Sequence, residues 1–282
     1  MDSRAAAPPP EQVTSADGTR IAYRRLGSGP AVVALHGGLG SWRSWEAVAR
    51  QLADRFEFLL VDRRGRGDSD DGARAHTLAQ EVADTRAVLR AAGPGAALLG
   101  HSYGGAVALE TARVAAPGET GALLLYEPAV GIDGAISAEQ LAALNQCVLD
   151  GVPEQAVPLS MRVLDSAGLV TADGPLATLK IKPTPAFRRL AATVPREIGA
   201  VATLGPGHIA SCGAIALPTL LLVGSESPPR AQANCHELAA VLPDVTVAPL
   251  DGLGHVAHTT APERVAAAIA PFLTAHAQRS TR

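Results

Sequence analysis

Short runs of purely apolar residues recur along the chain, and they restrict its fold more than any other feature. Strands that are apolar on both faces must be covered on both faces. Stretches with helical spacing of apolar residues, such as 42–52 and 77–89, separate these runs. Strands that alternate with helices predict an α/β fold with a mostly parallel sheet wrapped on both sides. The apolar runs are AVVAL (31–35), FLLV (58–61), AALL (96–99), ALLLY (122–126) and TLLLV (219–223).

The segment 131–216 breaks this rhythm. It contains no strong strand, and prolines interrupt its helical patches. An irregular loop of this length is rare in a compact domain, so we expect a mostly helical lid over the carboxyl edge of the sheet. The predicted core is then 11–130 together with 217–282. Residues 1–10 (MDSRAAAPPP) lack the apolar stretch of a signal peptide and are expected to be a disordered leader.

Composition excludes several classes of function. The formal charge of −3 leaves no basic excess to neutralise nucleic-acid phosphates or to bind an anionic membrane. No apolar run approaches the roughly 18 residues that a membrane helix needs. Cys147, Cys212 and Cys235 form no CxxC pair, which argues against a disulfide framework and a zinc site. We expect a cytoplasmic protein with a small-molecule substrate, and the oligomeric state stays open.

The pentapeptide Gly100-His101-Ser102-Tyr103-Gly104 follows an apolar run and opens a helical stretch. A sharp turn from strand to helix lifts a hydroxyl clear of the backbone, and only small neighbours avoid a clash there. The start of the helix also places amide N–H groups beside a developing anion. This pattern predicts Ser102 as a nucleophile. The alternative is a glycine-rich turn whose serine only caps the helix.

The run 31–41 (AVVALHGGLGS) ends a predicted strand in a glycine-rich loop. Such a loop can turn an amide toward Ser102, so we expect the N–H groups of Gly38 and Tyr103 to bind an oxyanion. A phosphate-binding loop is disfavoured, since no P-loop lysine follows and the glycine spacing is not that of a dinucleotide site. His36 is expected to be a structural hydrogen-bonding residue. The loop 62–69 (DRRGRGDS) is expected to be tight and ion-paired.

The sequence Gly252-Leu253-Gly254-His255 follows the last predicted strand. Its glycines allow a short loop to fold back toward Ser102, which makes His255 the predicted general base. His258 lies three residues later, but no carboxylate or third histidine is near enough in sequence for a metal site. We therefore expect neither a metal nor an organic cofactor.

Two carboxylates compete to orient His255. Glu226 follows the strand 219–223, and Glu127 follows the strand 122–126. Either can hold the imidazole tautomer and stabilise its protonated form. The residues alone leave both candidates open.

Together these motifs resemble the α/β-hydrolase superfamily, over residues 11 to about 277. The order Ser102, acid, His255 is the order of that fold. The resemblance implies an eight-stranded sheet, a helical cap inserted after the sixth strand, and a substrate pocket between cap and sheet. The family's usual G-x-x-D after the seventh strand has Ser227 in the Asp position. Some haloalkane dehalogenases place the acid after the sixth strand, in a sequence similar to 125–127, and this favours Glu127.

The function expected from these residues is a serine hydrolase that cleaves an ester, thioester or lactone of a small apolar molecule through an acyl-enzyme. Trp42 and Phe187 are candidate substrate contacts, and packing in the core is the alternative for Trp42, which shares a helix face with Trp45. Dehalogenases and epoxide hydrolases of the superfamily use Asp as nucleophile, so Ser102 argues against both. The alternatives are a C–C bond hydrolase or a secondary-metabolite cyclase that uses the same site. A ligand-binding receptor on a hydrolase fold is a third hypothesis, and only Ser227 supports it.

Overall fold

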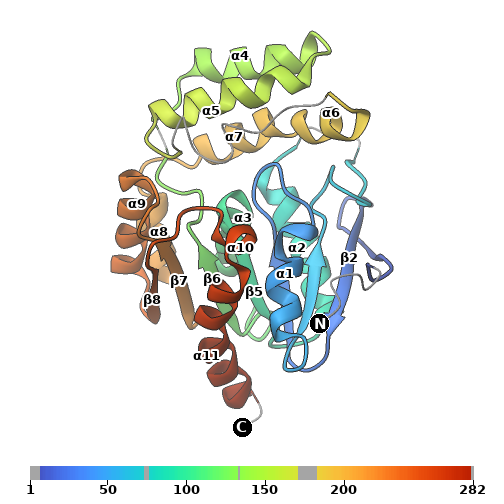
Figure 1. Cartoon of the computed structure of the whole chain (residues 1–282), viewed down its shortest axis with the longest axis vertical. Coiled ribbons are helices and arrows are strands. Elements are labelled where there is room, and N and C mark those ends of the chain that lie inside the picture. Colours follow the sequence, from blue (N-terminus) through green and yellow to red (C-terminus); the bar gives the residue numbers. More distant parts are fainter. Residues whose placement is uncertain (1–6, 73–75, 133, 171–182, 281–282) are drawn as a thin grey trace.

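The computed structural model describes residues 7–72, 76–132, 134–170 and 183–280. Its centre is an eight-stranded sheet with the order β1-β2-β4-β3-β5-β6-β7-β8 (Figure 1). The β1–β2 and β2–β4 pairs are antiparallel, and the other strand pairs are parallel. This arrangement confirms the predicted α/β fold. The strands are β1 (Glu11–Thr14), β2 (Arg20–Gly27), β3 (Ala31–Leu35), β4 (Glu57–Val61), β5 (Ala97–His101), β6 (Ala122–Tyr126), β7 (Thr219–Gly224) and β8 (Val245–Leu250).

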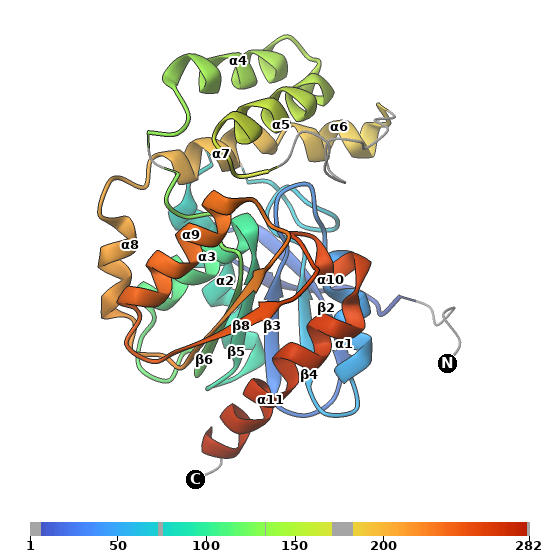
Figure 2. The same ribbon diagram turned by 60° about the vertical axis from the view of Figure 1, so that its left-hand side comes forward.

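Helices cover both faces of the sheet, as the two-sided apolar strands require (Figures 1 and 2). Every residue of β5, β6 and β7 is buried. One apolar core joins one face to α2 (Leu78–Ala92), α3 (Ser102–Val114) and α9 (Pro229–Val241). A second core joins the other face to α1 (Arg43–Leu52), α10 (Ala257–Thr260) and α11 (Pro262–Ser280).

The described part of the chain between β6 and β7 holds helices joined by turns and loops, and no strand. Four helices of this segment lie together beyond the carboxyl ends of the parallel strands (Figure 1), and we call them the lid helices. They are α4 (Ala138–Leu149), α5 (Ala156–Ser166), α6 (Pro185–Ala191) and α7 (Val194–Ala202), with the short 3-10 turn η1 (Pro153–Gln155) between α4 and α5.

The limits predicted for the lid and the leader stay predictions. Within the predicted lid, α8 (His208–Ser211) lies beside α9 (Figure 2), and the 3-10 turn η2 (Cys212–Ala214) follows it. Residues 171–182 of the lid and 1–6 of the leader fall outside the described residues. The carbonyl of Pro8, in the predicted leader, accepts a hydrogen bond from Arg24 Nε at 3.1 Å.

The strand register brings the sequence motifs to one edge of the sheet. Leu35 pairs with Gly100, His101 pairs with Tyr126, and Tyr126 pairs with Leu222. These residues are the last or nearly the last of their strands. The loops that carry the glycine run, Ser102, Glu127 and Ser227 therefore begin side by side.

No helix within the described ranges has both the length and the apolarity needed to cross a lipid bilayer. The thiols of Cys212 and Cys235 are free and buried, and Cys147 is free and partly exposed. The cytoplasmic location expected from the cysteines stays a prediction.

Close packing of α3 against the sheet generates a stability prediction. A Cβ on Gly104 would overlap the backbone carbonyl oxygen atoms of Leu35 and His36. Gly104→Ala should therefore lower the free energy of unfolding by about 1–3 kcal/mol, the usual cost of overpacking. Gly199→Ala, inside α7, is the matched control because nothing lies within 4 Å of the new methyl group. It should raise the free energy of unfolding by up to about 1 kcal/mol. Urea unfolding measures both, and an unchanged midpoint for Gly104→Ala would contradict the packing described here.

Candidate active site

Ser102 occupies the sharp turn between β5 and α3. Its φ of 51° lies in the left-handed region that side chains rarely adopt. The flanking glycines make the turn possible: a Cβ on Gly100 would overlap the carbonyl of Gly104, and Gly104 itself lies against the end of β3. The turn therefore has the geometry that the G-x-S-x-G pattern predicts.

Backbone strain is concentrated around Ser102. Three non-glycine residues have positive φ within the part of the chain that the structure describes: Leu39 (56°), Ser102 (51°) and Glu127 (41°). Each of them lines one cavity. Strained backbone of this kind costs on the order of 1–3 kcal/mol per residue and clusters at functional sites.

Glu127 is the carboxylate that meets His255. It follows β6 directly and is 3% exposed. Its Oε2 lies 2.6 Å from Nδ1 of His255, and its Oε1 accepts hydrogen bonds from the Gly224 amide (2.7 Å) and the Ser227 hydroxyl (2.6 Å). Since a carboxylate only accepts, His255 carries its proton on Nδ1 and leaves Nε2 free as a base.

Glu226, the other candidate acid, has an exposed side chain. Its amide donates to the carbonyl of Leu253 at 2.9 Å, and its carboxylate makes no hydrogen bond with any described residue. The position where the family pattern expects Asp is filled by Ser227, whose hydroxyl supports Glu127. The carboxylate that is hydrogen-bonded to the imidazole thus follows β6, the strand next to β7.

Three further hydrogen bonds hold the loop that carries His255. His101 Nε2 donates to the carbonyl of His255 at 2.8 Å. The Tyr126 hydroxyl donates to the carbonyl of Gly254 and accepts from the Ala257 amide. The loop is therefore fixed to the end of β5, next to Ser102, and to the end of the neighbouring strand β6.

Ser102 and His255 line the same cavity, which has a volume of about 330 Å³. Among the described residues no hydrogen bond joins the Ser102 hydroxyl to the imidazole; such contacts are often long without substrate and shorten in the complex. Gly38 and Tyr103, the predicted oxyanion donors, also line the cavity. Most of its remaining wall is aliphatic and comes partly from the lid helices: Leu39, Ile132, Met161, Leu164, Ile198 and Val201.

Trp42 and Phe187 do not line this cavity, which corrects their expected role as substrate contacts. Trp42 is 5% exposed, and its ring lies between the guanidinium groups of Arg24 and Arg43, at 4.4 and 4.5 Å. Phe187, in α6, lines a separate hollow between that helix and the loop after β4. Trp42 directly precedes α1 and Trp45 lies within it, and both side chains belong to the core on that face of the sheet.

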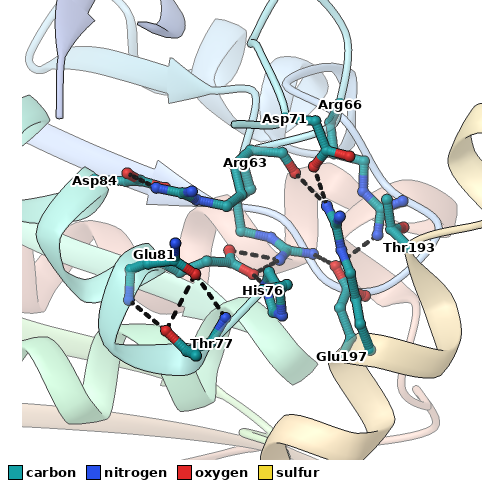
Figure 3. A network of polar contacts seen from close by, with 12 residues as sticks. Arg63, Arg66, Asp71, His76, Thr77, Glu81, Asp84, Thr193 and Glu197 are labelled. Atoms are coloured by element: carbon teal, nitrogen blue, oxygen red, sulfur yellow. Dashed lines mark hydrogen bonds and ion pairs between the residues drawn. The ribbon is translucent and has the colours of Figure 1, made fainter. Parts of the chain in front are cut away.

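The loop 62–69 is ion-paired, as predicted, and Arg63 is its centre (Figure 3). Its Nη1 binds Glu81 in α2 at 2.8 Å, and its Nη2 binds Glu197 in α7 at 2.6 Å. The same guanidinium donates to the carbonyls of His36 (2.9 Å) and Gly37 (3.1 Å). Arg63 therefore connects the glycine-rich loop after β3 to a core helix and to a lid helix.

Electrostatics keep this network charged. Burial opposes the charge of Arg63, but Glu197 and Glu81 outweigh that effect and raise its pKa. Burial also opposes the charge of Glu81, but Arg63 and His76 outweigh that effect and lower the pKa of Glu81.

His36 donates from Nδ1 to the Gly37 carbonyl and accepts from the Arg63 amide at Nε2, which makes it the structural residue that the sequence predicts.

Glu197 is the site residue that sequence reasoning missed. Val194, Ile198 and Val201 share its face of α7, and all four residues line the cavity. A charged residue within an apolar stripe of helical spacing is the signal that could have identified it. The prolines of the lid segment obscured that stripe.

Two buried histidines pack around His255. The ring centroids of His101 and His258 are 4.2 Å apart, and His101 lies 4.6 Å from His255. Burial, then the neighbouring histidines, lowers the pKa of His101 and brings that of His258 to about 3. Both rings are therefore neutral near pH 7. No group of three or more potential metal ligands occurs among the residues that the structure describes.

Comparison with known proteins identifies the family. The model of the alpha/beta hydrolase family matches residues 32–268. The chain therefore belongs to the alpha/beta hydrolase family, a family of hydrolytic enzymes. An alpha/beta hydrolase from Sphaerobacter thermophilus is 30% identical, with a TM-score of 0.76 over 94% of this chain and 99% of that chain. The esterase RhEst1 from a Rhodococcus species shares the fold at 24% identity, with a TM-score of 0.68 over 94% and 98% of the two chains.

Sequence relatives with named activities match shorter stretches. Lipase LipV of Mycobacterium tuberculosis is 36% identical over 119 residues, which are 42% of this chain and 44% of that protein. A soluble epoxide hydrolase of a Corynebacterium species is 37% identical over 95 residues, which are 33% of this chain and 32% of that protein. The aligned part spans only about a third of the curated relatives that match first.

The buried histidines generate a pH prediction. The pKa of His258 is about 3 in the folded chain, below the ordinary 6.5, so protons bind the unfolded chain more readily. The stability contributed by neutral His258 is complete above about pH 6.5 and is lost as the pH falls toward 3, at up to about 1.4 kcal/mol per pH unit. In His258→Phe, the slope of the free energy of unfolding against pH should be smaller than in the wild type between pH 6 and 4.5, by up to about 1.4 kcal/mol per pH unit. Exposed His236→Gln is the control and should keep the wild-type slope, and equal slopes for all three proteins would refute the prediction.

Proposed function

We propose that this chain is a serine hydrolase that cleaves an ester, thioester or lactone of a small apolar molecule through an acyl-enzyme. The observation that carries the proposal is the 2.6 Å hydrogen bond between Glu127 and His255, at the wall of the cavity that Ser102 also lines. A buried carboxylate, an imidazole and a hydroxyl in one cavity are the three parts of a nucleophilic triad.

In the proposed mechanism, the Ser102 hydroxyl attacks the substrate carbonyl while Nε2 of His255 takes its proton. Glu127 holds the imidazole in the required tautomer and stabilises the imidazolium. The amides of Gly38 and Tyr103 bind the oxyanion, and each such donor typically lowers the barrier by ~3 kcal/mol. His255 then passes its proton to the leaving group, and water, activated by the same imidazole, hydrolyses the acyl-enzyme.

The relatives and the cavity support this choice of reaction. LipV is named a lipase, which favours an ester substrate. The aliphatic wall of the cavity favours a small apolar acyl group. A soluble epoxide hydrolase is also among the relatives, but epoxide hydrolases of this superfamily attack with Asp, and this chain has Ser102 in that position. The receptor hypothesis rested only on Ser227 in the position of the usual acid. The hydrogen bond between Glu127 and His255 argues against it, because it offers a carboxylate for the same role.

Replacing the nucleophile tests the reaction. Wild-type protein should hydrolyse p-nitrophenyl butyrate and should gain one phosphonyl group on Ser102 from a fluorophosphonate probe. Ser102→Ala should lose the label and at least about 10³-fold in kcat. Intact mass measures labelling, and a quenched reaction should contain an acyl-enzyme in the wild type only. Turnover without labelling or an acyl-enzyme would instead favour the C–C hydrolase or cyclase hypothesis.

Replacing the two acids tests the triad. Glu127→Gln keeps the shape of the side chain but removes the charge that stabilises the imidazolium, so kcat should fall by about 10³- to 10⁴-fold. Glu226→Gln is the matched control, because its exposed carboxylate has no contact with His255, and its kcat should equal that of the wild type. Steady-state kinetics with p-nitrophenyl butyrate measure both variants. The reverse pattern would assign the acid to Glu226.

A further inference from the structure

The carboxylate of Glu197 has one bonded and one unbonded oxygen. Glu197 is 4% exposed, and its Oε1 accepts from Arg63 Nη2 (2.6 Å) and Arg66 Nη2 (2.5 Å) (Figure 3). Its Oε2 accepts no hydrogen bond from any residue that the structure describes. That oxygen lies 3.4 Å from the place where a Cβ on Gly38 would stand. Oε2 is therefore an acceptor beside the proposed oxyanion loop, on a residue that lines the cavity.

The surroundings of Oε2 make its lack of a partner costly. The nearest members of its own helix face are Val194, Ile198 and Val201, which line the cavity and offer no side-chain donor. An apolar substrate in this cavity would remove water from Oε2 and supply nothing in return. A substrate with a hydroxyl, amide N–H or ammonium group at this point would satisfy it.

We propose that Glu197 is a specificity-determining residue, and that its Oε2 accepts a hydrogen bond from a donor group near the reacting carbonyl of the substrate. The inference rests on the proposed hydrolase function and narrows its substrate class. The preferred substrates are esters, thioesters or lactones that are mainly aliphatic and carry one hydroxyl or N–H donor close to the bond that is cleaved. Sites built to bind a substrate donor discriminate strongly against the analogue that lacks it.

The wild-type protein alone provides the first test. Three p-nitrophenyl esters differ only at the third carbon of the acyl chain. Butyrate has no polar group there, 3-hydroxybutyrate has a hydroxyl donor, and 3-oxobutyrate has a carbonyl acceptor. Propyl and 2-hydroxyethyl butyrate, followed by proton release, make the same comparison on the alcohol. We expect at least about a tenfold higher kcat/KM for the donor-bearing ester in one of the two series. Equal or lower kcat/KM for the donor-bearing ester in both series would overturn the proposal.

The second test reverses the hydrogen-bonding sense. In Glu197→Gln the amide oxygen can keep its contacts with Arg63 and Arg66 while the NH₂ group faces the cavity. The preference for the donor-bearing ester should then disappear. If the wild type shows that preference in the acyl series, the kcat/KM of the variant for the 3-oxobutyrate ester should rise relative to its kcat/KM for the 3-hydroxybutyrate ester. An equal loss for every ester would mean that Glu197 serves only to hold the lid, and would overturn the proposal.

Glu110→Gln is the matched control. Glu110 is also buried and ion-paired, with Arg113 at 2.8 Å and with His208, but it does not line the cavity. Its variant should keep the wild-type preference. Thermal unfolding of both variants identifies any loss of folded protein. If a variant does not fold, the comparison of esters with the wild-type protein still tests the proposal.

Labelling of Ser102 by a fluorophosphonate separates the two proposals. Without labelling the hydrolase proposal fails, whereas labelling without donor preference contradicts only the role of Glu197.

Discussion

The parallel pairing of β5 with β6 determines where the candidate active site can form. His101 and Tyr126 are partners in this pairing, so Ser102 and Glu127 are each the first residue beyond a matched pair. Both leave the sheet with positive φ. Side chains at equivalent points of adjacent parallel strands begin about 4.8 Å apart, within reach of one imidazole. The His255 loop needs only to fold back over this edge, where His101 and Tyr126 hold it.

Arg63 couples this edge to the lid. Its guanidinium binds two carbonyls of the glycine-rich loop after β3, Glu81 in the core and Glu197 in α7, and it lies 4.7 Å from the ring centroid of Tyr103. A buried charge of this kind is stable only while its partners stay in place. One side chain therefore contacts both the lid helix α7 and the glycine-rich loop after β3.

The sequence predicted the sheet and most of the candidate site because both depend on local signals. Two-sided apolar runs specify buried strands, and glycine patterns mark the turns at Ser102 and before His255. The choice between Glu127 and Glu226 could not be made from spacing, since it depends on which strand end faces the imidazole. The choice between a pocket and a core role for Trp42 could not be made, because periodicity gives the face of a helix but not the surface that this face meets; the structure places Trp42 in the core. Glu197 was missed because its partners Arg63 and Arg66 are more than 130 positions away in the chain.

The Ser227 position has a consequence for how divergent family members are recognised. A pattern search that demands an acid after the seventh strand would score this chain as defective, although a buried carboxylate reaches the imidazole from one strand away. Ser227 stands at the position where the pattern expects the acid, and its hydroxyl donates a hydrogen bond to the Glu127 carboxylate. Apparent pseudoenzymes of this architecture should therefore be inspected at both strand ends before they are considered inactive.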